Sequence, residues 1–210
     1  MHRMTEQKHG FWFHFLDVLL NIVVIVAIVA GIRTFLVSPF QVEGNSMVDT
    51  LEDKEYIIIN KLAYILGQPK RGDVVVFRPP NDPSKFYVKR VIGMPGDKVL
   101  IKDGFISIEQ PGQQDFQQLD EKSYLDPQNL GRTYRHPPSS GDTSPVEYDI
   151  PADKYFVMGD NRGGSLDSRS FMVNGEPEPF VPRSDIKGRV WIVALPITKI
   201  HALEVPSYAK

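Results

Sequence analysis

The sequence predicts a mainly β protein, in which an antiparallel β-sheet domain follows one N-terminal transmembrane helix. Two observations lead to this fold class. Residues 15–37 form a nearly continuous apolar run, and the chain beyond it alternates short β-branched runs with turns rich in Gly, Pro and Asp. A chain of 210 residues can supply one anchor and one folded domain, since domains cluster at roughly 100 to 150 residues.

The apolar run from Phe15 to Val37 is long enough to cross a membrane. At about 1.5 Å per residue it spans a hydrocarbon core of roughly 30 Å. A cleaved signal peptide is one alternative, but it would need a shorter run and a small residue two positions before Ala30, where this chain has Ile28. A buried helix of a soluble domain is the other alternative, although a helix apolar on every face suits lipid better. We therefore expect residues 1–37 to form a tail and a retained anchor.

Residues 38–205 are expected to form the folded domain. Its expected strands are bounded by Gly, Pro, Asp or Lys, and they cover residues 56–59, 74–77, 86–92, 98–101, 105–108, 155–158 and 190–195. Between residues 109 and 150 the composition shifts to Gln, Pro, Ser, Gly and Asp, with few apolar side chains to bury. We expect this segment to be an exposed, partly mobile insertion of variable sequence.

The composition excludes several classes of function. With 24 basic and 26 acidic residues the formal net charge is -2, and no basic run is interleaved with aromatic side chains, so we expect no nucleic-acid partner. The chain has no cysteine, which rules out disulfides, thiolate ligands and a thiol nucleophile. Its five histidines are scattered, and no glycine-rich phosphate loop follows a strand, so we expect neither a metal site nor a cofactor.

Ser46, in a loop that starts at Gly44, is the first residue that could carry chemistry. A serine nucleophile needs a base, and none of the histidines is well placed to serve. Lys89 is the other candidate base, because it lies in an alternating strand in which Arg90 faces the opposite side, so one of these two basic residues should point inward. Burial would have to lower the lysine pKa by roughly 2 to 3 units. Taken alone, the serine also fits an ordinary turn and the lysine an exposed sheet surface.

A third stretch, GDNRGGSLDSR at residues 159–169, follows an expected strand. Its Asp and Arg residues are close enough to form ion pairs that brace the loop, and its serines can hydrogen-bond an amine. By itself the pattern fits a well-capped turn equally well.

Four stretches in a fixed order carry a resemblance to a known family. They are GNSMVDTL at 44–51, RGDVVVF at 71–77, YVKRVIGMPGDKV at 87–99 and GDNRGGSLDSR at 159–169. With the anchor before them, the chain closely resembles the bacterial type I signal peptidases over about residues 15–102 and 151–195. Its single anchor and short insertion are similar to the Gram-positive type.

The resemblance implies a membrane-anchored serine endopeptidase that removes N-terminal signal peptides from exported preproteins. Ser46 matches the nucleophile and Lys89 the general base. Gly44 stands where the family has a second oxyanion donor, and Ser165 matches the serine that orients the lysine amine. The implied location is the cytoplasmic membrane, with the N-terminus inside and the catalytic domain outside. The implied partners are membrane lipid and the signal peptides of preproteins that emerge from the secretion translocon.

The resemblance also assigns supporting residues. The structural ion pairs would join Asp167 to Arg169 and Asp160 to Arg90. Shallow pockets for the small residues one and three before the cut would be lined by Phe40, Val42, Leu51 and Val88.

The chain departs from the family pattern in the nucleophile loop and in the last motif. Asp49 stands where a proline is usual, and Gly163 and Gly164 stand where an asparagine is expected, which predicts a more flexible loop. These departures leave open a catalytically silent member that binds signal peptides or partner proteins. A second alternative is a self-cleaving Ser/Lys protease of the repressor type, but the membrane anchor argues against it. A third is a membrane-tethered β domain without catalytic activity, which would require the four ordered motifs to be a coincidence. We expect Asp49→Pro to preserve or raise activity.

Overall fold

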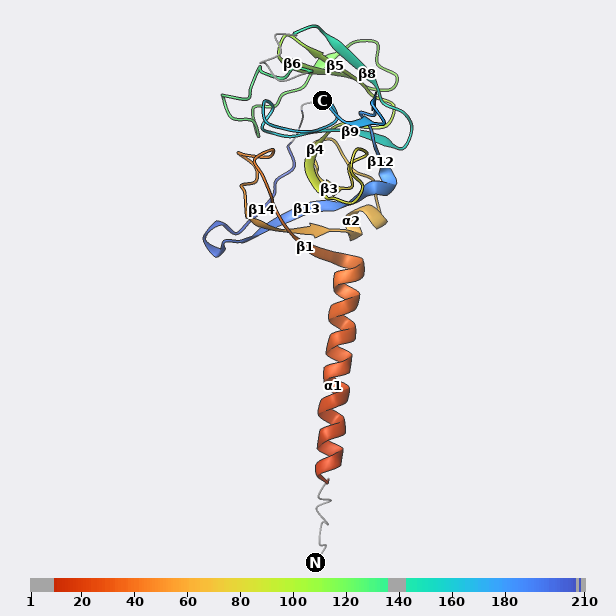
Figure 1. Ribbon diagram of the computed structural model, residues 1–210, viewed down its shortest axis with the longest axis vertical. Helices are drawn as coiled ribbons and strands as arrows, with labels where there is room; N and C mark the ends of the chain where they lie inside the picture. The colour runs from red at the N-terminus through yellow and green to blue at the C-terminus, as the bar shows by residue number, and fades with distance from the viewer. Residues whose placement is uncertain (1–9, 136–142, 207, 209–210) are drawn as a thin grey trace, which may run out of the picture.

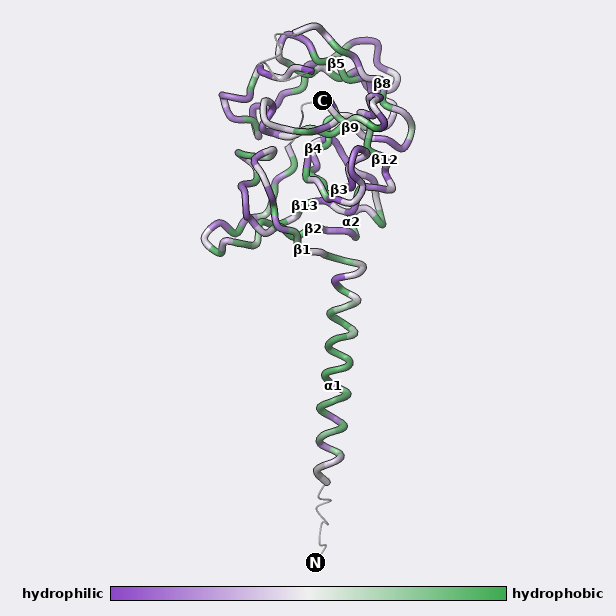
Figure 2. The backbone as a smooth tube through the Cα atoms, viewed as in Figure 1, coloured by the Kyte–Doolittle hydropathy of each residue, from purple (hydrophilic) through white to green (hydrophobic). Residues whose placement is uncertain are grey.

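The computed structural model describes residues 10–135, 143–206 and 208. A long helix, α1 (Phe11–Gly31), leads through a π-helical turn, η1 (Ile32–Leu36), into a β domain (Figure 1). Figure 2 shows that α1 is apolar along most of its length. The predicted fold class, a mainly antiparallel β protein with one N-terminal apolar helix, is confirmed.

In the described part of the chain, one helix is long and apolar enough to cross a membrane, over Trp12–Thr34. This span lies three residues earlier in the chain than the predicted run of residues 15–37. It cannot extend to Val37, because Val37 already belongs to the first strand. The end of the helix is tied to the domain by Lys61, whose Nζ donates to the carbonyl oxygens of Arg33 at 3.0 Å and Thr34 at 3.2 Å. These bonds satisfy carbonyl groups that a helix end leaves without partners.

The larger sheet lies next to the end of α1 (Figure 1). Its strand order is β1-β2-β13-β3-β4-β9-β12, with β14 beside β13, and every pairing is antiparallel. The bounds are β1 Val37–Gln41, β2 Tyr56–Asn60, β3 Val74–Phe77, β4 Tyr87–Gly93, β9 Lys154–Met158, β12 Val181–Pro182, β13 Ile186–Leu195 and β14 His201–Ala202. The edge strand β1 was not predicted, because Pro39 reads as a turn; proline is tolerated at a sheet edge, where its missing N–H costs no ladder bond.

The smaller sheet caps the domain at the end away from α1 (Figure 1). Its order is β7-β6-β5-β8, from Gln117–Gln118, Phe105–Glu109, Lys98–Lys102 and Val146–Asp149. The remaining elements are short: β10 Met172–Val173, β11 Glu176–Pro177, α2 Leu62–Ile65, η3 Arg183–Asp185 and η4 Ile197–Lys199.

Residues 109–150 were expected to form an exposed insertion; most of the described residues of this segment are exposed or partly exposed, but several belong to the smaller sheet or are buried. Two of its strands, β7 and β8, extend the smaller sheet. Leu119, Leu125, Glu121 and Thr133 are all buried. The composition is polar, but a few apolar side chains and one carboxylate meet partners in the rest of the domain, which composition alone cannot reveal. Residues 136–142 lie outside the described part.

Strand β4 crosses the middle of the larger sheet between β3 and β9, and both of its faces are covered. Lys89 is 4% exposed and Arg90 is 1% exposed. The expectation that only one of these basic residues points inward is therefore wrong. Arg90 is buried because its guanidinium lies 4.1 Å from the ring centre of Tyr124, a residue of the 109–150 segment that packs over the second face of the strand.

Candidate active site

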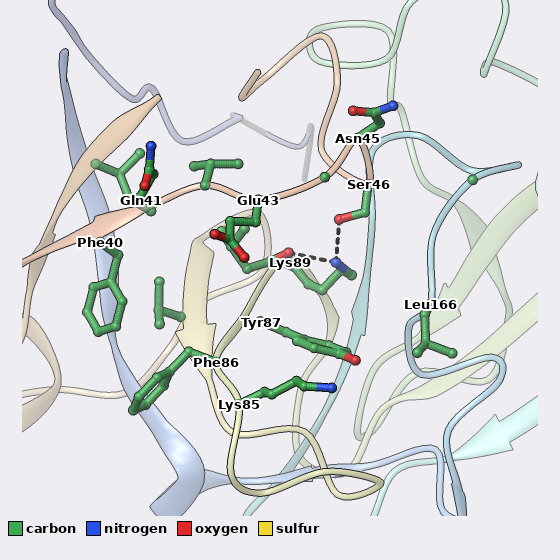
Figure 3. Close-up of a pocket in the computed structure, with 16 residues that line it drawn as sticks. Phe40, Gln41, Glu43, Asn45, Ser46, Lys85, Phe86, Tyr87, Lys89 and Leu166 are labelled. Atoms are coloured by element: carbon green, nitrogen blue, oxygen red, sulfur yellow. Dashed lines mark hydrogen bonds between the residues drawn. The ribbon is translucent and has the colours of Figure 1, made fainter. Parts of the chain in front are cut away.

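Ser46 and Lys89, 43 residues apart in the sequence, meet at the centre of the site (Figure 3). Ser46 lies in the turn after β1, and Lys89 projects from β4. The Nζ atom of Lys89 is 2.6 Å from Ser46 Oγ. The same Nζ donates to the carbonyl oxygen of Val88 at 2.9 Å, which holds the amine in place. A neutral amine in this position has its lone pair free for the serine hydroxyl proton.

Burial lowers the pKa of Lys89 to about 8, because the charged ammonium loses its hydration. The nearby carboxylates of Asp167 and Asp160 act in the opposite direction, and Arg169 adds to the lowering. The net effect brings the amine close enough to neutrality to act as a base at physiological pH.

The nucleophile turn is held by the loop that follows β9. Thr50 Oγ1 donates to Asp160 Oδ2 at 2.5 Å. Asn161 donates through its side chain to the carbonyl oxygen of Asn45 at 3.0 Å and through its backbone N–H to that of Ser46 at 3.1 Å. Thr50 and Asn161 were not predicted as site residues. Both lie inside the quoted motifs, but their role depends on contacts across more than a hundred residues of sequence.

Two glycines of this loop fit against the site with no room for a side chain. A Cβ at Gly159 would lie 2.4 Å from the carbonyl oxygen of Ser46 and 2.2 Å from Ser165 Oγ. A Cβ at Gly164 would lie 2.7 Å from Asn161 Nδ2, and the Gly164 N–H donates to Asn161 Oδ1 at 3.1 Å. Gly164 is therefore packed against Asn161 rather than loose, whereas Gly163 faces open space.

Both expected ion pairs are present in the structure. Arg90 meets Asp160 through Nε to Oδ1 at 2.9 Å and Nη2 to Oδ2 at 2.7 Å. Arg169 meets Asp167 through Nε to Oδ1 at 2.8 Å and Nη2 to Oδ2 at 2.7 Å. Paired bonds of this kind fix the direction of both side chains. Asp167 also accepts the Gly159 N–H at 3.0 Å, so the second pair braces the loop behind the serine.

Ser165 and Gly44 do not make the contacts that were expected of them, which were to orient the lysine amine and to bind the oxyanion. Ser165 Oγ is buried and makes no hydrogen bond to Lys89 Nζ; the Val88 carbonyl holds the amine instead. The Gly44 N–H already donates to Asp53 Oδ1 at 2.8 Å, so it is not a free oxyanion donor. The Ser46 N–H has no partner among the residues described and remains available for that purpose.

A cleft of about 570 Å³ contains the serine and the lysine. Figure 3 shows Phe40 near one end and Leu166 near the other, with Ser46 and Lys89 between them. Val42 and Val88, two of the residues predicted to form substrate pockets, line the cleft together with Phe40. Leu51 does not line it; its side chain is 1% exposed and packs in the hydrophobic core.

Asp49 points away from Lys89 and toward the 109–150 segment. Its Oδ2 accepts a hydrogen bond from Asn129 Nδ2 at 3.4 Å. Partial burial raises the pKa of Asp49, and the nearby carboxylate of Asp126 raises it further. The charged groups that act on the pKa of Lys89 are Asp167, Asp160 and Arg169, so Asp49 does not hold the lysine in its charged form. Its backbone φ is +86°, a left-handed conformation that is unfavourable for a residue with a side chain.

The expectation that Asp49→Pro is tolerated is contradicted by this backbone, since proline fixes φ near −65°. We expect Asp49→Pro to lower the free energy of unfolding by about 3 kcal/mol or more, and Asp49→Gly to raise it by about 1 kcal/mol, because glycine adopts positive φ without strain. Chemical denaturation of the two variants and the parent measures both effects. Asp49→Asn, which removes only the charge, is the control. A proline variant as stable as the parent would show that the turn adopts a different backbone.

A serine hydroxyl beside a buried amine, in a cleft of about 570 Å³, is the arrangement of a serine hydrolase that uses lysine as its base. Comparison with known proteins agrees. The model of the family described as signal peptidase, peptidase S26, matches residues 15–195. Signal peptidase I of Pseudomonas aeruginosa is 32% identical, covering 89% of this chain and 74% of that protein.

Two relatives from Bacillus subtilis are similar as well. Signal peptidase I T is 41% identical over 71% of this chain and 72% of its own length. Signal peptidase I P from the subspecies natto is 32% identical over 89% of this chain and 92% of its own length. The chain belongs to the signal peptidase family.

Proposed function

We propose that this protein is a membrane-anchored signal peptidase that removes N-terminal signal peptides from exported preproteins, with Ser46 as nucleophile and Lys89 as general base. Its family membership supports the reaction, since the relatives are named signal peptidases. The observation that carries the assignment of roles is the 2.6 Å contact between Lys89 Nζ and Ser46 Oγ, together with the burial that lowers the lysine pKa.

In the first half of the reaction the neutral amine of Lys89 takes the Ser46 hydroxyl proton as Oγ attacks the carbonyl carbon before the cut. The Ser46 N–H stabilises the oxyanion that forms. The resulting ammonium then gives its proton to the nitrogen of the breaking amide bond, the mature protein leaves, and the signal peptide stays on Oγ as an ester.

In the second half Lys89 takes a proton from water, which attacks the ester carbonyl. The ester bond breaks, the proton returns to Ser46 Oγ, and the signal peptide leaves with a carboxyl group at its new end. No group outside the chain and water is needed.

The substrate is expected to bind as an extended strand. β1 is an edge of the larger sheet, and the chain that continues from it lines the cleft up to Ser46. Exposed backbone at such an edge pairs with a peptide, while small pockets select alternate side chains. Phe40, Val42 and Val88 form the apolar wall for the small residues before the cut.

We infer that α1 places the domain at the outer surface of the cytoplasmic membrane, with the N-terminus inside. Its length and apolar composition fit a membrane anchor. The partners are then membrane lipid and preproteins leaving the translocon. A catalytically silent member, the alternative motivated by Asp49 and by Gly163 and Gly164, is not favoured. Asp49 bonds to Asn129 rather than facing Lys89, and Gly164 packs against Asn161.

The pH dependence of cleavage tests the proposed base. Only the neutral amine accepts a proton, so kcat/KM for a preprotein with Ala one and three residues before the cut should rise with pH through an apparent pKa near 8 and then level off. Circular dichroism at each pH controls for unfolding. A rate that is independent of pH from 6 to 10, on folded protein, would contradict Lys89 as the base.

A further inference from the structure

A second cavity, of about 340 Å³, adjoins the catalytic cleft. The two share Gly164 and Leu166 as lining residues. In Figure 3, Leu166 lies on the side of Ser46 opposite Phe40. A peptide whose residues before the cut occupy the Phe40 end must therefore continue past Leu166 once it has passed the serine.

Three arginines line this second cavity, and their charges are not equally compensated. Arg162 is buried and forms an ion pair with Glu121. Arg169 is paired with Asp167. Arg135 is exposed and has no ion pair within the described part of the chain, and no described acidic side chain lines the cavity. Arg135 therefore carries the one positive charge of this cavity that no described acidic side chain compensates.

A third cavity, of about 240 Å³, lies beside the second. They share Arg135, Arg169 and Ser170, and the third continues along Tyr148 and Phe171. Arg135 thus lines both of these cavities, and the shared lining residues link the catalytic cleft and the two cavities into a path that begins at the serine. A chain in extended form can follow this path for several residues beyond the cut.

We propose that this second cavity binds the first residues of the mature protein, those just after the cut, and that Arg135 gives it a preference for an acidic side chain there. The inference rests on the proposed function and adds to it a charge preference on the far side of the cut. An exposed ion pair is weak, so we expect the preference for Glu over Lys to be about fivefold in kcat/KM and to decrease at high salt.

The test uses detergent-solubilised full-length protein and preproteins that differ only in carrying Glu, Gln or Lys at each of the first few positions after the cut. The parent should cleave the Glu series fastest at one position. Arg135→Glu should reverse the order to favour Lys. Arg132→Glu is the matched control, because Arg132 is also an exposed arginine of this segment but does not line the cavity, so the parent order should remain.

The outcomes separate the two proposals. If every substrate is cleaved but Glu and Lys give equal rates, or if Arg135→Glu keeps the parent order, the acidic subsite is wrong and the signal peptidase assignment stands. If folded parent protein cleaves none of the substrates, the proposed function fails and the inference falls with it. An order that reverses in both variants would indicate a general surface-charge effect and would overturn the role of Arg135.

Discussion

Ser46→Ala and Lys89→Met are each expected to reduce preprotein cleavage by at least about a thousandfold, with the double variant no slower than either. The reason is the single 2.6 Å contact between the two side chains: without the amine the hydroxyl stays protonated, and without the hydroxyl the amine has nothing to activate. Single-turnover cleavage of a preprotein with Ala one and three before the cut measures all three variants.

The control for this result is the thermal stability of the Lys89→Met variant, which shows whether a loss of cleavage reflects unfolding. The pKa of Lys89 is lowered in the folded protein from 10.5 to about 8, so below about pH 8 the buried charge destabilises the folded state in full, and this cost is lost as pH rises from 8 toward 10.5. Replacing the amine with the apolar Met should leave Tm at neutral pH unchanged or raise it, and the gain should shrink as pH rises toward 10. A Lys89→Met variant that keeps near-normal rates would exclude Lys89 as the base.

Glu121→Ala is expected to lower the free energy of unfolding by about 3 to 5 kcal/mol, because it leaves the guanidinium of Arg162 buried without its ion-pair partner. Arg162 Nη1 donates to Glu121 Oε2 at 3.0 Å and to Thr133 Oγ1 at 2.6 Å. Its Nε donates to the carbonyl oxygen of Gly159 at 3.2 Å, so cleavage should decrease as well. Urea denaturation measures the stability.

The matched control is Glu178→Ala, which removes a partly exposed partner of Lys154 at 2.9 Å. An ion pair of this kind contributes at most about 1 kcal/mol. Equal, small effects of the two substitutions would show that water reaches Arg162 and that the 109–150 segment does not support the catalytic loop.

The contacts of the 109–150 segment explain why it affects the site, although it supplies neither the serine nor the lysine. Tyr124 covers Arg90, and the carbonyl oxygen of Tyr134 accepts a bond from Arg169 Nη1 at 3.0 Å. Asn129 Oδ1 accepts the backbone N–H of Arg162 at 2.9 Å. The segment therefore holds the loop at residues 159–169 in place, and that loop positions the turn that carries Ser46.

Local patterns were sufficient where a residue's neighbours in sequence decide its structure. The apolar run predicts α1, and β-branched runs between turns predict β3 to β6, because periodicity and turn chemistry act over a few residues. The order of the motifs predicts that Ser46 and Lys89 belong together. β1 was missed because Pro39 resembles a turn, and its place at the sheet edge is decided by pairing with β2.

The sequence by itself determined the anchor, the β class and the serine–lysine pair, because each of these features depends on residues that are adjacent in the chain or that form recognisable motifs. Only the tertiary structure decided that Val88 rather than Ser165 holds the amine, that Gly44 is engaged by Asp53, and that Tyr124 packs over Arg90 on the second face of β4. Those features depend on which distant groups share a buried space, and burial is a property of the whole fold.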